Sequence, residues 1–407
     1  MDKMLGNNHF KILNGENILE ISKKANKARK EGNQIVDATI GMLFDDESNL
    51  ASFDLVKNII KEANDSTTLR YGGVTGDLEF QEGVKNWLFE GVNLEQTFVQ
   101  VIATIGATGA LSLSMRNYTN IKQEILVPSL RWSSYDNIAS QAYCKIKEYN
   151  MFNGDDKLDL ESIKSAVEDS INKYQRVYLL INDPCQNPTG YSMNYHEWEE
   201  LLSYLKEVSK NYPVVLLDDI AYMNYSDASY QPIFQLMVDS LNDNLMIQIA
   251  FSASKTLSIY GLRGGALVGL SKNKETINSF LKISEETARS IWSMPNNIAC
   301  KVIKECFKNQ ENRQEIKNQI DKYKAMINNR AKIFLEEAEL VDLINYNYVN
   351  GFFVLIPCLN SLEVVEKLME EDVYVVPMGD GLRISLASVP TSKIDGLAKK
   401  IKKAMTK

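Results

Sequence analysis

The chain has 407 residues, of which 44% are hydrophobic and 24% charged, and its formal net charge is −8. This length and composition predict a globular protein with a large core and two domains, and the negative charge argues against a nucleic-acid partner. The five cysteines are scattered without a C-x-x-C pair and the only histidines are His9 and His196, so we expect no disulfide framework, no metal site and no histidine-based acid–base catalysis.

The N-terminal segment Met1–Leu13 is too polar and too interrupted for the core of a signal peptide. No run of 18 or more apolar residues follows it. We therefore expect a cytoplasmic protein with no membrane partner. The first predicted helix covers Ile18–Lys30.

Apolar runs of strand length alternate with amphipathic segments through the middle of the chain. The predicted strands are Phe98–Ala103, Glu124–Val127, Arg176–Asn182, Val214–Asp219, Leu245–Phe251 and Leu262–Leu270. Helical patterns between them include Leu158–Ile171 and Tyr195–Ser209. Strands that are apolar throughout and separated by helices predict a sheet covered on both faces, which is an α/β fold.

The last third of the chain has a different pattern, helical and highly charged from about Ile277 to Glu339. Three predicted strands then surround one helix: strands Leu343–Ile356, Val373–Val376 and Leu382–Leu386, and helix Leu362–Glu371. This pattern predicts a smaller α+β unit, which the N-terminal segment is expected to complete because termini often pack together. The predicted domains are 46–300 and 1–45 with 301–407.

Two turns after predicted strands have compositions that suit a ligand site. Small residues in Gly106–Leu111 open a helix and leave backbone N–H groups free for a phosphate, although the turn lacks the G-x-G-x-x-G pattern of a dinucleotide site. The second turn is Asn187-Pro188-Thr189-Gly190, whose residues also form ordinary loops.

Two further turns place charged groups at the ends of buried strands. Asp218 and Asp219 close the strand that begins at Val214, where a carboxylate needs a partner such as a protonated pyridine nitrogen or serves as a helix cap. Lys255 lies between two apolar runs, and a desolvated lysine suits Schiff-base chemistry, although a solvated charge is the simpler reading of that string alone. Arg263, eight residues later, is a permanent cation suited to a phosphate.

Taken in this order, the motifs resemble the fold-type I pyridoxal-phosphate enzymes, specifically the class I aminotransferases related to aspartate and aromatic aminotransferases. The resemblance spans roughly Ile40 to Arg383. It implies a large domain with a mostly parallel seven-stranded sheet flanked by helices, and a smaller α+β C-terminal domain. It also implies pyridoxal 5'-phosphate as the cofactor.

The resemblance implies a role for each matching residue. Lys255 would form the internal aldimine and then move the proton, Asp219 would pair with the pyridinium nitrogen, and Tyr222 would bond the phenolic oxygen of the ring. Asn187 would share that oxygen and reach the substrate. The phosphate would be held by Ser252, Arg263, Thr108 and the N–H of Ala107. Trp132 would stack on the ring, although two extra residues precede it in Pro128–Trp132 and a core position is the alternative.

Other matching residues would bind the substrate or the second subunit. Gly41 would line the substrate pocket and Arg383 would hold the α-carboxylate in a bidentate fork. Tyr71, in Tyr71–Gly76, would reach the phosphate of the partner in a homodimer with shared active sites; a surface aromatic before a glycine turn is the alternative. Arg289 would receive a distal carboxylate from the partner's substrate, or would pair within its helix with Glu285 and Glu286, four and three residues earlier.

The implied reaction is transamination between an acidic or aromatic L-amino acid and a 2-oxo acid. A β-lyase or amino-acid decarboxylase of the same fold is the alternative. A penicilloyl-serine-type hydrolase would match Ser252–Lys255 as S-x-x-K, but the S-D-N and K-T-G partners do not occur. A regulator with this fold would need a DNA-binding domain, for which we expect the segment before residue 40 to be too short.

Overall fold

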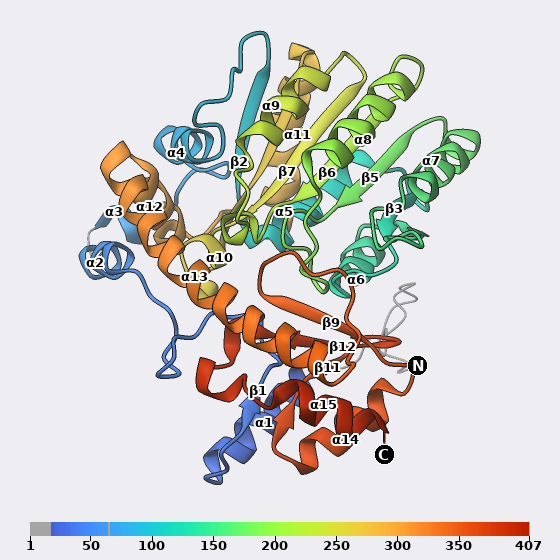
Figure 1. Ribbon diagram of the computed structural model, residues 1–407. Coiled ribbons are helices and arrows are strands. Elements are labelled where there is room, and N and C mark those ends of the chain that lie inside the picture. The colour runs from blue at the N-terminus through green and yellow to red at the C-terminus, as the bar shows by residue number, and fades with distance from the viewer. Residues whose placement is uncertain (1–17, 64–65, 407) are drawn as a thin grey trace, which may run out of the picture.

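Seven strands form the central sheet of the computed structural model, which describes residues 18–63 and 66–406 (Figure 1). In sheet order they are β2 (Phe98–Ile105), β8 (Gly264–Ser271), β7 (Leu245–Ser252), β6 (Val214–Asp219), β5 (Val177–Ile181), β3 (Glu124–Pro128) and β4 (Lys145–Tyr149). Only β8 runs antiparallel to its two neighbours. The predicted α/β fold with a mostly parallel sheet is confirmed. The predictions for Met1–Leu13 and His9 concern residues outside the described part of the chain.

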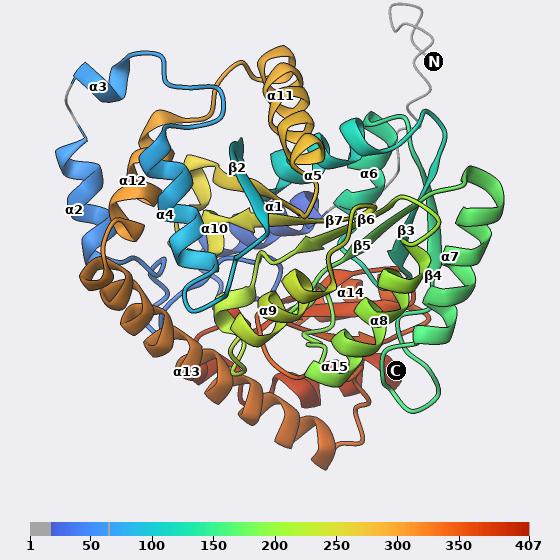
Figure 2. The same cartoon turned by 90° about the horizontal axis from the view of Figure 1, so that it is seen from above.

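Helices cover both faces of this sheet (Figure 2). One face carries α5 (Gly106–Tyr118), α6 (Ser134–Gln141) and α11 (Lys274–Ile291), and the other carries α7 (Leu160–Tyr174), α8 (Tyr195–Val208) and α9 (Gln231–Ser240). Successive residues of a strand point to opposite faces. In β6, Leu216 accordingly belongs to the core with α8 and Leu217 to the core with α5.

The C-terminal residues build the smaller unit with the first described helix. Its antiparallel sheet has the order β11 (Val376–Pro377), β12 (Gly381–Ser385), β9 (Phe353–Pro357), and β1 (Val36–Asp37) pairs in parallel with β10 (Val373–Tyr374). The helices are α1 (Ile18–Lys30), α14 (Ser361–Glu370) and α15 (Leu397–Thr406). The N-terminal segment is thus joined to the C-terminal unit through the pairing of β1 with β10.

The remaining helices connect these parts. They are α2 (Asp54–Glu62), α3 (Ser66–Leu69), α4 (Leu78–Leu88), α10 (Ala253–Thr256), α12 (Asn297–Phe307), α13 (Gln310–Leu340) and the 3₁₀ turns η1 (Met223–Tyr225), η2 (Tyr260–Leu262), η3 (Leu386–Ser388) and η4 (Thr391–Lys393). Along α13, Ile316 and Ile320 pack in the core of the large unit, and Ala331 and Phe334 in that of the small unit. The predicted domain limits stay a prediction.

Two predicted strands begin two or more residues earlier than in the structure, and one strand of the structure was not predicted. The strand predicted over Leu343–Ile356 is wrong in extent, because β9 begins only at Phe353 and the loop before it donates N–H groups from Val349 and Asn350 to the carbonyl of Gly190. The strand predicted from Leu262 starts at Gly264, after the turn η2. Strand β4 was not predicted, since it is an edge strand that alternates charged residues with Ile146.

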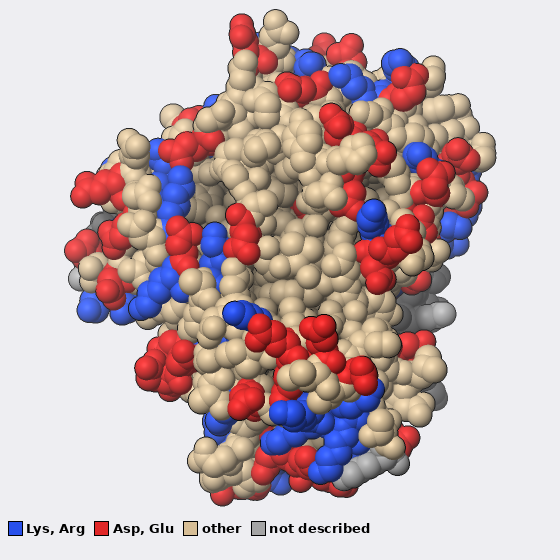
Figure 3. All heavy atoms as spheres, viewed as in Figure 1, with Lys and Arg blue, Asp and Glu red and all other residues tan. Residues whose placement is uncertain are grey.

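Within residues 18–63 and 66–406, no helix has the length and apolar character to cross a bilayer. The same residues contain no group of three or more His, Cys, Asp or Glu side chains placed to bind a metal ion. On the face drawn in Figure 3, acidic and basic side chains are interspersed around a largely uncharged central region between the two units.

Candidate active site

A cavity of about 330 Å³ opens between the carboxyl ends of the central strands and the small unit. This is the edge at which ligands bind in open α/β sheets. Both units line it, with the residues Ser22, Thr39, Ile40, Gly41, Met42, Ala107, Thr108, Trp132, Tyr135, Asn182, Asn187, Asp219, Ala221, Tyr222, Ser252, Ser254, Lys255, Tyr260, Arg263, Phe353 and Arg383. Eleven of the thirteen predicted site residues are therefore brought together; the exceptions are Tyr71 and Arg289.

Lys255 enters the cavity from α10, directly after β7. Its Nζ donates to the carbonyl oxygen of Gly41 at 2.6 Å and lies 4.7 Å from the centroid of the Tyr260 ring. Burial lowers the pKa of Lys255 to about 7, and the positive charges of Arg383 and Arg263 act in the same direction. An amine with this pKa is partly neutral near pH 7, which is the form that acts as a nucleophile or a base.

Asp219 ends β6 and is buried on the face of the sheet that α5 and α6 cover. Its Oδ2 accepts from the hydroxyl of Tyr135 at 2.7 Å, and its Oδ1 accepts from the N–H of Ala221 at 3.2 Å. Burial raises the pKa of Asp219 to about 6, while Tyr135, Ala221 and the charge of Lys255 oppose that rise. A buried carboxylate of this kind is stabilised by a cationic hydrogen-bond partner in the cavity.

One end of the cavity is suited to a phosphate. Helix α5 begins at Gly106 without a side-chain cap, so its first N–H groups have no intrahelical partner. Gly106 has φ 73°, and a Cβ there would lie 2.7 Å from Nη2 of Arg263, which places the guanidinium directly over the turn. Arg263 also donates from Nη1 to the hydroxyl of Ser254 at 3.1 Å.

The opposite end is suited to a carboxylate. Arg383, on β12, is buried and donates from Nη1 to Oδ1 of Asn187 at 3.2 Å and from Nη2 to the carbonyl of Thr39 at 2.8 Å. Its Nε has no partner within the described residues. Burial lowers the pKa of Arg383 to about 10, which leaves it charged at neutral pH. The ring of Phe353 covers one side of the guanidinium, with 4.5 Å between Cζ and the ring centroid.

Trp132 and Tyr222 form parts of the cavity wall. Trp132 lies edge-on to Tyr135, with centroids 5.6 Å apart, and so faces the cavity despite the two extra residues before it. The Tyr222 hydroxyl lies 3.5 Å from the position that a Cβ on Gly41 would take. Burial raises the pKa of Tyr222, so its hydroxyl is protonated at neutral pH.

Tyr71 and Arg289 lie outside this cavity. Tyr71 is 89% exposed, in the segment between α3 and α4. Arg289 is exposed in the last turn of α11, and neither Glu285 nor Glu286 forms an ion pair with it in the described part of the chain. The intrahelical ion pair considered for Arg289 is therefore not formed.

Ten of the lining residues were not predicted from the sequence, and four of them, Tyr135, Asn182, Ser254 and Tyr260, place polar groups in the site. Asn182 follows β5 as Asp219 ends β6, and its Nδ2 donates to the carbonyl of Asp219 at 2.6 Å. The rule that located Asp219, a polar residue at a buried strand end, applies equally to Asn182. Tyr135 carries no such signal, since an aromatic residue in the first turn of an amphipathic helix reads as core.

Asp183 and Asp218 form a second buried acidic group, on the sheet face opposite to Asp219. The Tyr230 hydroxyl lies 2.8 Å from Oδ2 of Asp218 and 3.2 Å from Oδ2 of Asp183, and it has one hydrogen to donate. Asp218 Oδ1 has no partner among the described residues. Burial raises the pKa of Asp183 to about 7. Burial also raises the pKa of Asp218, and the negative charge of Asp183 raises it further.

We expect this pair to make the stability of the protein depend on pH. Because the folded-state pKa of Asp183 is raised from 3.8 to about 7, its contribution is complete below pH 3.8 and is lost as the pH rises toward 7. Across that window the pair lowers the free energy of unfolding by up to about 1.4 kcal/mol per pH unit for each proton released. Urea unfolding of wild type and Asp218→Asn at pH 5, 6 and 7 checks this, and the variant should show the shallower decline. Parallel curves would contradict it. The other titratable groups around the pair, among them Tyr230, Glu197, Cys185 and Asp219, are present in both proteins.

Known proteins are similar to this chain over most of its length. The model of a family described as aminotransferase class I and II matches residues 40–401. A probable aspartate aminotransferase of Methanocaldococcus jannaschii is 28% identical over 341 residues, which are 80% of this chain and 82% of that protein.

Two solved structures extend this similarity over nearly the whole fold. The crystal structure of an aminotransferase from Anaerococcus prevotii has a TM-score of 0.93 and 28% identity, and the match covers 99% of this chain and 100% of that one. The aromatic-amino-acid aminotransferase of Burkholderia pseudomallei, covalently bound to pyridoxal phosphate, has a TM-score of 0.80 and 20% identity, with 95% and 96% covered.

Proposed function

The chain belongs to the aminotransferase class I and II family and is a pyridoxal-phosphate-dependent aminotransferase, and we propose that it moves the amino group of acidic or aromatic L-amino acids to a 2-oxo acid, with Lys255 as the lysine that binds the cofactor. The observation that carries the assignment of residues is the meeting of three groups in one cavity: Lys255 with a lowered pKa, the buried carboxylate Asp219 and the open guanidinium of Arg383.

The donor set of the cavity fits pyridoxal phosphate. The uncapped start of α5, with the N–H of Ala107, the side chain of Thr108, Ser252 and Arg263, would hold the phosphate. Asp219 would hold the ring nitrogen, since a buried carboxylate with a raised pKa is stabilised by a cation. Tyr222 and the side-chain amide of Asn187 would donate to the ring oxygen, and Trp132 would lie against the ring. When bound, the cofactor supplies an electron sink for the Cα–H bond of the amino acid.

The protein's own residues then divide the remaining work. Arg383 would bind the α-carboxylate of the amino acid through its fork, including the unpartnered Nε, and so orient Cα. Lys255, partly neutral near pH 7, would take the Cα proton on Nζ and hold it for the next transfer. The two units around the cavity, with Gly41 and Phe353 at its wall, would keep water away from the reacting atoms.

A screen of the cofactor-loaded protein against the standard L-amino acids tests the function. Loss of the cofactor's visible absorbance with a donor, and its recovery with a 2-oxo acid, would support transamination. Release of carbon dioxide, or of ammonia with a 2-oxo acid and no acceptor requirement, would instead indicate the decarboxylase or β-lyase alternative.

Arg289 is proposed to receive the distal carboxylate of an acidic donor in the partner subunit. Its exposure and the absence of a Glu285 or Glu286 ion pair among the described residues support this. Arg289→Ala is expected to reduce kcat/KM for glutamate or aspartate by roughly 2–5 kcal/mol in activation free energy, the scale of leaving a buried charge unpaired. Neutral aromatic donors should change little, so kinetics with glutamate and phenylalanine check the prediction. Equal losses for both donors would contradict it.

A homodimer with shared sites is part of the proposal. The exposed ring of Tyr71, in the segment between the exposed Leu69 at the end of α3 and the exposed Leu78 at the start of α4, supports a contact surface there, with Tyr71 donating to the phosphate of the partner's cofactor. Tyr71→Phe is expected to weaken cofactor retention by about 1 kcal/mol, the value of one hydrogen bond, as dialysis of the loaded protein would measure. A fully active monomer in sedimentation equilibrium would contradict the dimer.

We also place the enzyme in the cytoplasm, where its five free cysteines stay reduced.

A further inference from the structure

The segment Thr39–Asp46, which we call the strap, lies along the wall of the active site without regular secondary structure over most of its length. Three consecutive strap carbonyls accept hydrogen bonds from side chains: Thr39 from Arg383 at 2.8 Å, Ile40 from Ser385 at 2.8 Å and Gly41 from Lys255 at 2.6 Å. The strap therefore touches both the cation that would bind the substrate carboxylate and the lysine that would move the proton. Because it makes so few ladder hydrogen bonds of its own, its position depends on such side-chain contacts.

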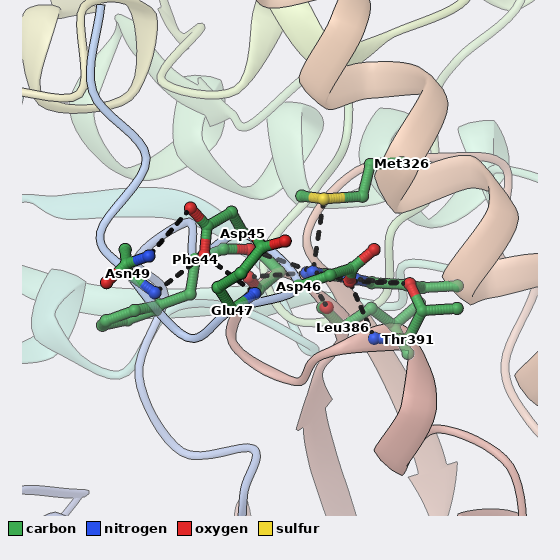
Figure 4. Close-up of polar contacts among 10 residues, drawn as sticks. Phe44, Asp45, Asp46, Glu47, Asn49, Met326, Leu386 and Thr391 are labelled. Atoms are coloured by element: carbon green, nitrogen blue, oxygen red, sulfur yellow. Dashed lines mark hydrogen bonds and ion pairs between the residues drawn. The ribbon is translucent and has the colours of Figure 1, made fainter.

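The far end of the strap is held by Arg330, which projects from α13 and is 0% exposed. Its five N–H donors meet five oxygen acceptors. These are the carbonyls of Phe44 (3.0 Å), Leu386 (3.3 Å) and Ala387 (3.1 Å), the carboxylate of Asp46 (2.7 Å) and the hydroxyl of Thr391 (3.4 Å). Figure 4 shows Phe44 and Asp46 of the strap beside Leu386 and Thr391 of the small unit.

Asp46 is the only carboxylate bound to Arg330 among the described residues. Its Oδ1 also accepts from the N–H and the hydroxyl of Thr391, at 2.9 and 2.8 Å. Burial acts to raise the pKa of Asp46, but the bonds from Arg330 and Thr391 outweigh it and leave that pKa below its usual value. One charged pair thus ties the strap, α13 and the segment after β12 together, and we call Asp46, Arg330 and Thr391 the clasp.

We propose that Asp46 and Arg330 are positioning residues of the active site: their ion pair anchors the strap, so that the carbonyls of Thr39 and Gly41 stay on Arg383 and Lys255 and the substrate carboxylate meets a fixed guanidinium. The clasp holds the strap at Phe44 and Asp46, three and five residues after Gly41, and so acts on the site through the strap. The kinetic part of this proposal rests on the proposed function, whereas the anchoring part concerns the protein alone.

Hydrogen–deuterium exchange tests the anchoring, with Asp46→Ala as the variant because Asp46 is half exposed and Arg330 fully buried. The N–H of Leu43 donates to the Tyr260 hydroxyl and that of Phe44 to the Ala387 carbonyl, so both report on the strap. We expect these amides to exchange about tenfold faster in the variant, while peptides of α15 exchange as in wild type. Asp54→Ala, an exposed carboxylate paired with Lys57, is the matched control and should change neither.

Steady-state kinetics of the loaded enzyme test the effect on the site. With glutamate or phenylalanine as donor, Asp46→Ala should raise KM about tenfold and change kcat less than about threefold, since carboxylate binding is weakened and the proton-transfer groups remain. Asp46→Asn, which keeps the acceptor oxygen and loses the charge, should lie between the two proteins in both measurements.

Two results would overturn the proposal. Unchanged exchange at Leu43 and Phe44, or equally faster exchange in α15, would show that the clasp does not hold the strap in particular. Faster strap exchange with an unchanged KM would show that the strap does not position the site. If wild type turns over neither donor, the proposed donor class fails, and the exchange experiment still decides the anchoring.

Discussion

Replacing Lys255 by alanine is expected to abolish turnover and leave the fold intact. The side chain is one of several groups around the cavity and its ammonium is disfavoured by burial, while Asp219, whose carboxylate its charge favours, keeps its hydrogen bonds from Tyr135 and Ala221. The loss of rate should reach about 10⁴-fold or more, because one positioned general base supplies up to about 10⁴ and the covalent attachment of the cofactor is lost as well. Single-turnover absorbance with an amino-acid donor measures it.

The matched control is Lys272→Ala, which removes an exposed lysine after β8 and should retain activity. Borohydride treatment of the loaded wild-type protein should fix the cofactor to the peptide that contains Lys255. Fixation on a different lysine would contradict the assignment of Lys255 and, with it, the reading of the whole cavity.

Replacing Asp219 by alanine is expected to lower kcat by roughly 10³-fold, the scale found when one preorganised charged or hydrogen-bonding group is removed from a reacting centre. Substrate binding should suffer less, since the carboxylate matters most as negative charge develops on the ring. Rapid kinetics that separate KM from kcat check this split. Removal of Asp219 also leaves the Tyr135 hydroxyl without its acceptor, so the double variant Asp219→Ala with Tyr135→Phe should recover some stability.

Asp218→Ala is the control for this prediction. Its carboxyl lies on the opposite face of the sheet, against Tyr230, and the variant should keep most of its activity while its stability changes. The reverse result, with Asp218→Ala inactive and Asp219→Ala active, would mean that the two adjacent carboxyls have been assigned to the wrong faces.

Much of the fold was predictable because local pattern reflects local burial. Helix Ile18–Lys30 and strand Val214–Asp219 have the predicted bounds, since an amphipathic period and an apolar run each mark one element. The edge strand β4 was not predicted because one side of it faces solvent and it contains both charged and apolar residues. The loop 342–352 was mistaken for strand because apolar residues in it, such as Tyr348, pack against the Asn187–Gly190 turn instead of pairing in a sheet.

The sequence by itself determined the α/β class, the order of the motifs and most of the groups that line the cavity, because polar residues at the ends of buried strands collect at one edge of a parallel sheet. The residues alone left open which of Asp218 and Asp219 faces the cavity; the resemblance implied Asp219, and the tertiary structure shows the reason, because α6 covers that sheet face with Tyr135. It likewise brought Thr39 to Arg383 and Asp46 to Arg330, 344 and 284 residues apart. Such contacts depend on the path of the strap past β12 and α13, and the local periodicity of the sequence carries no information about that path.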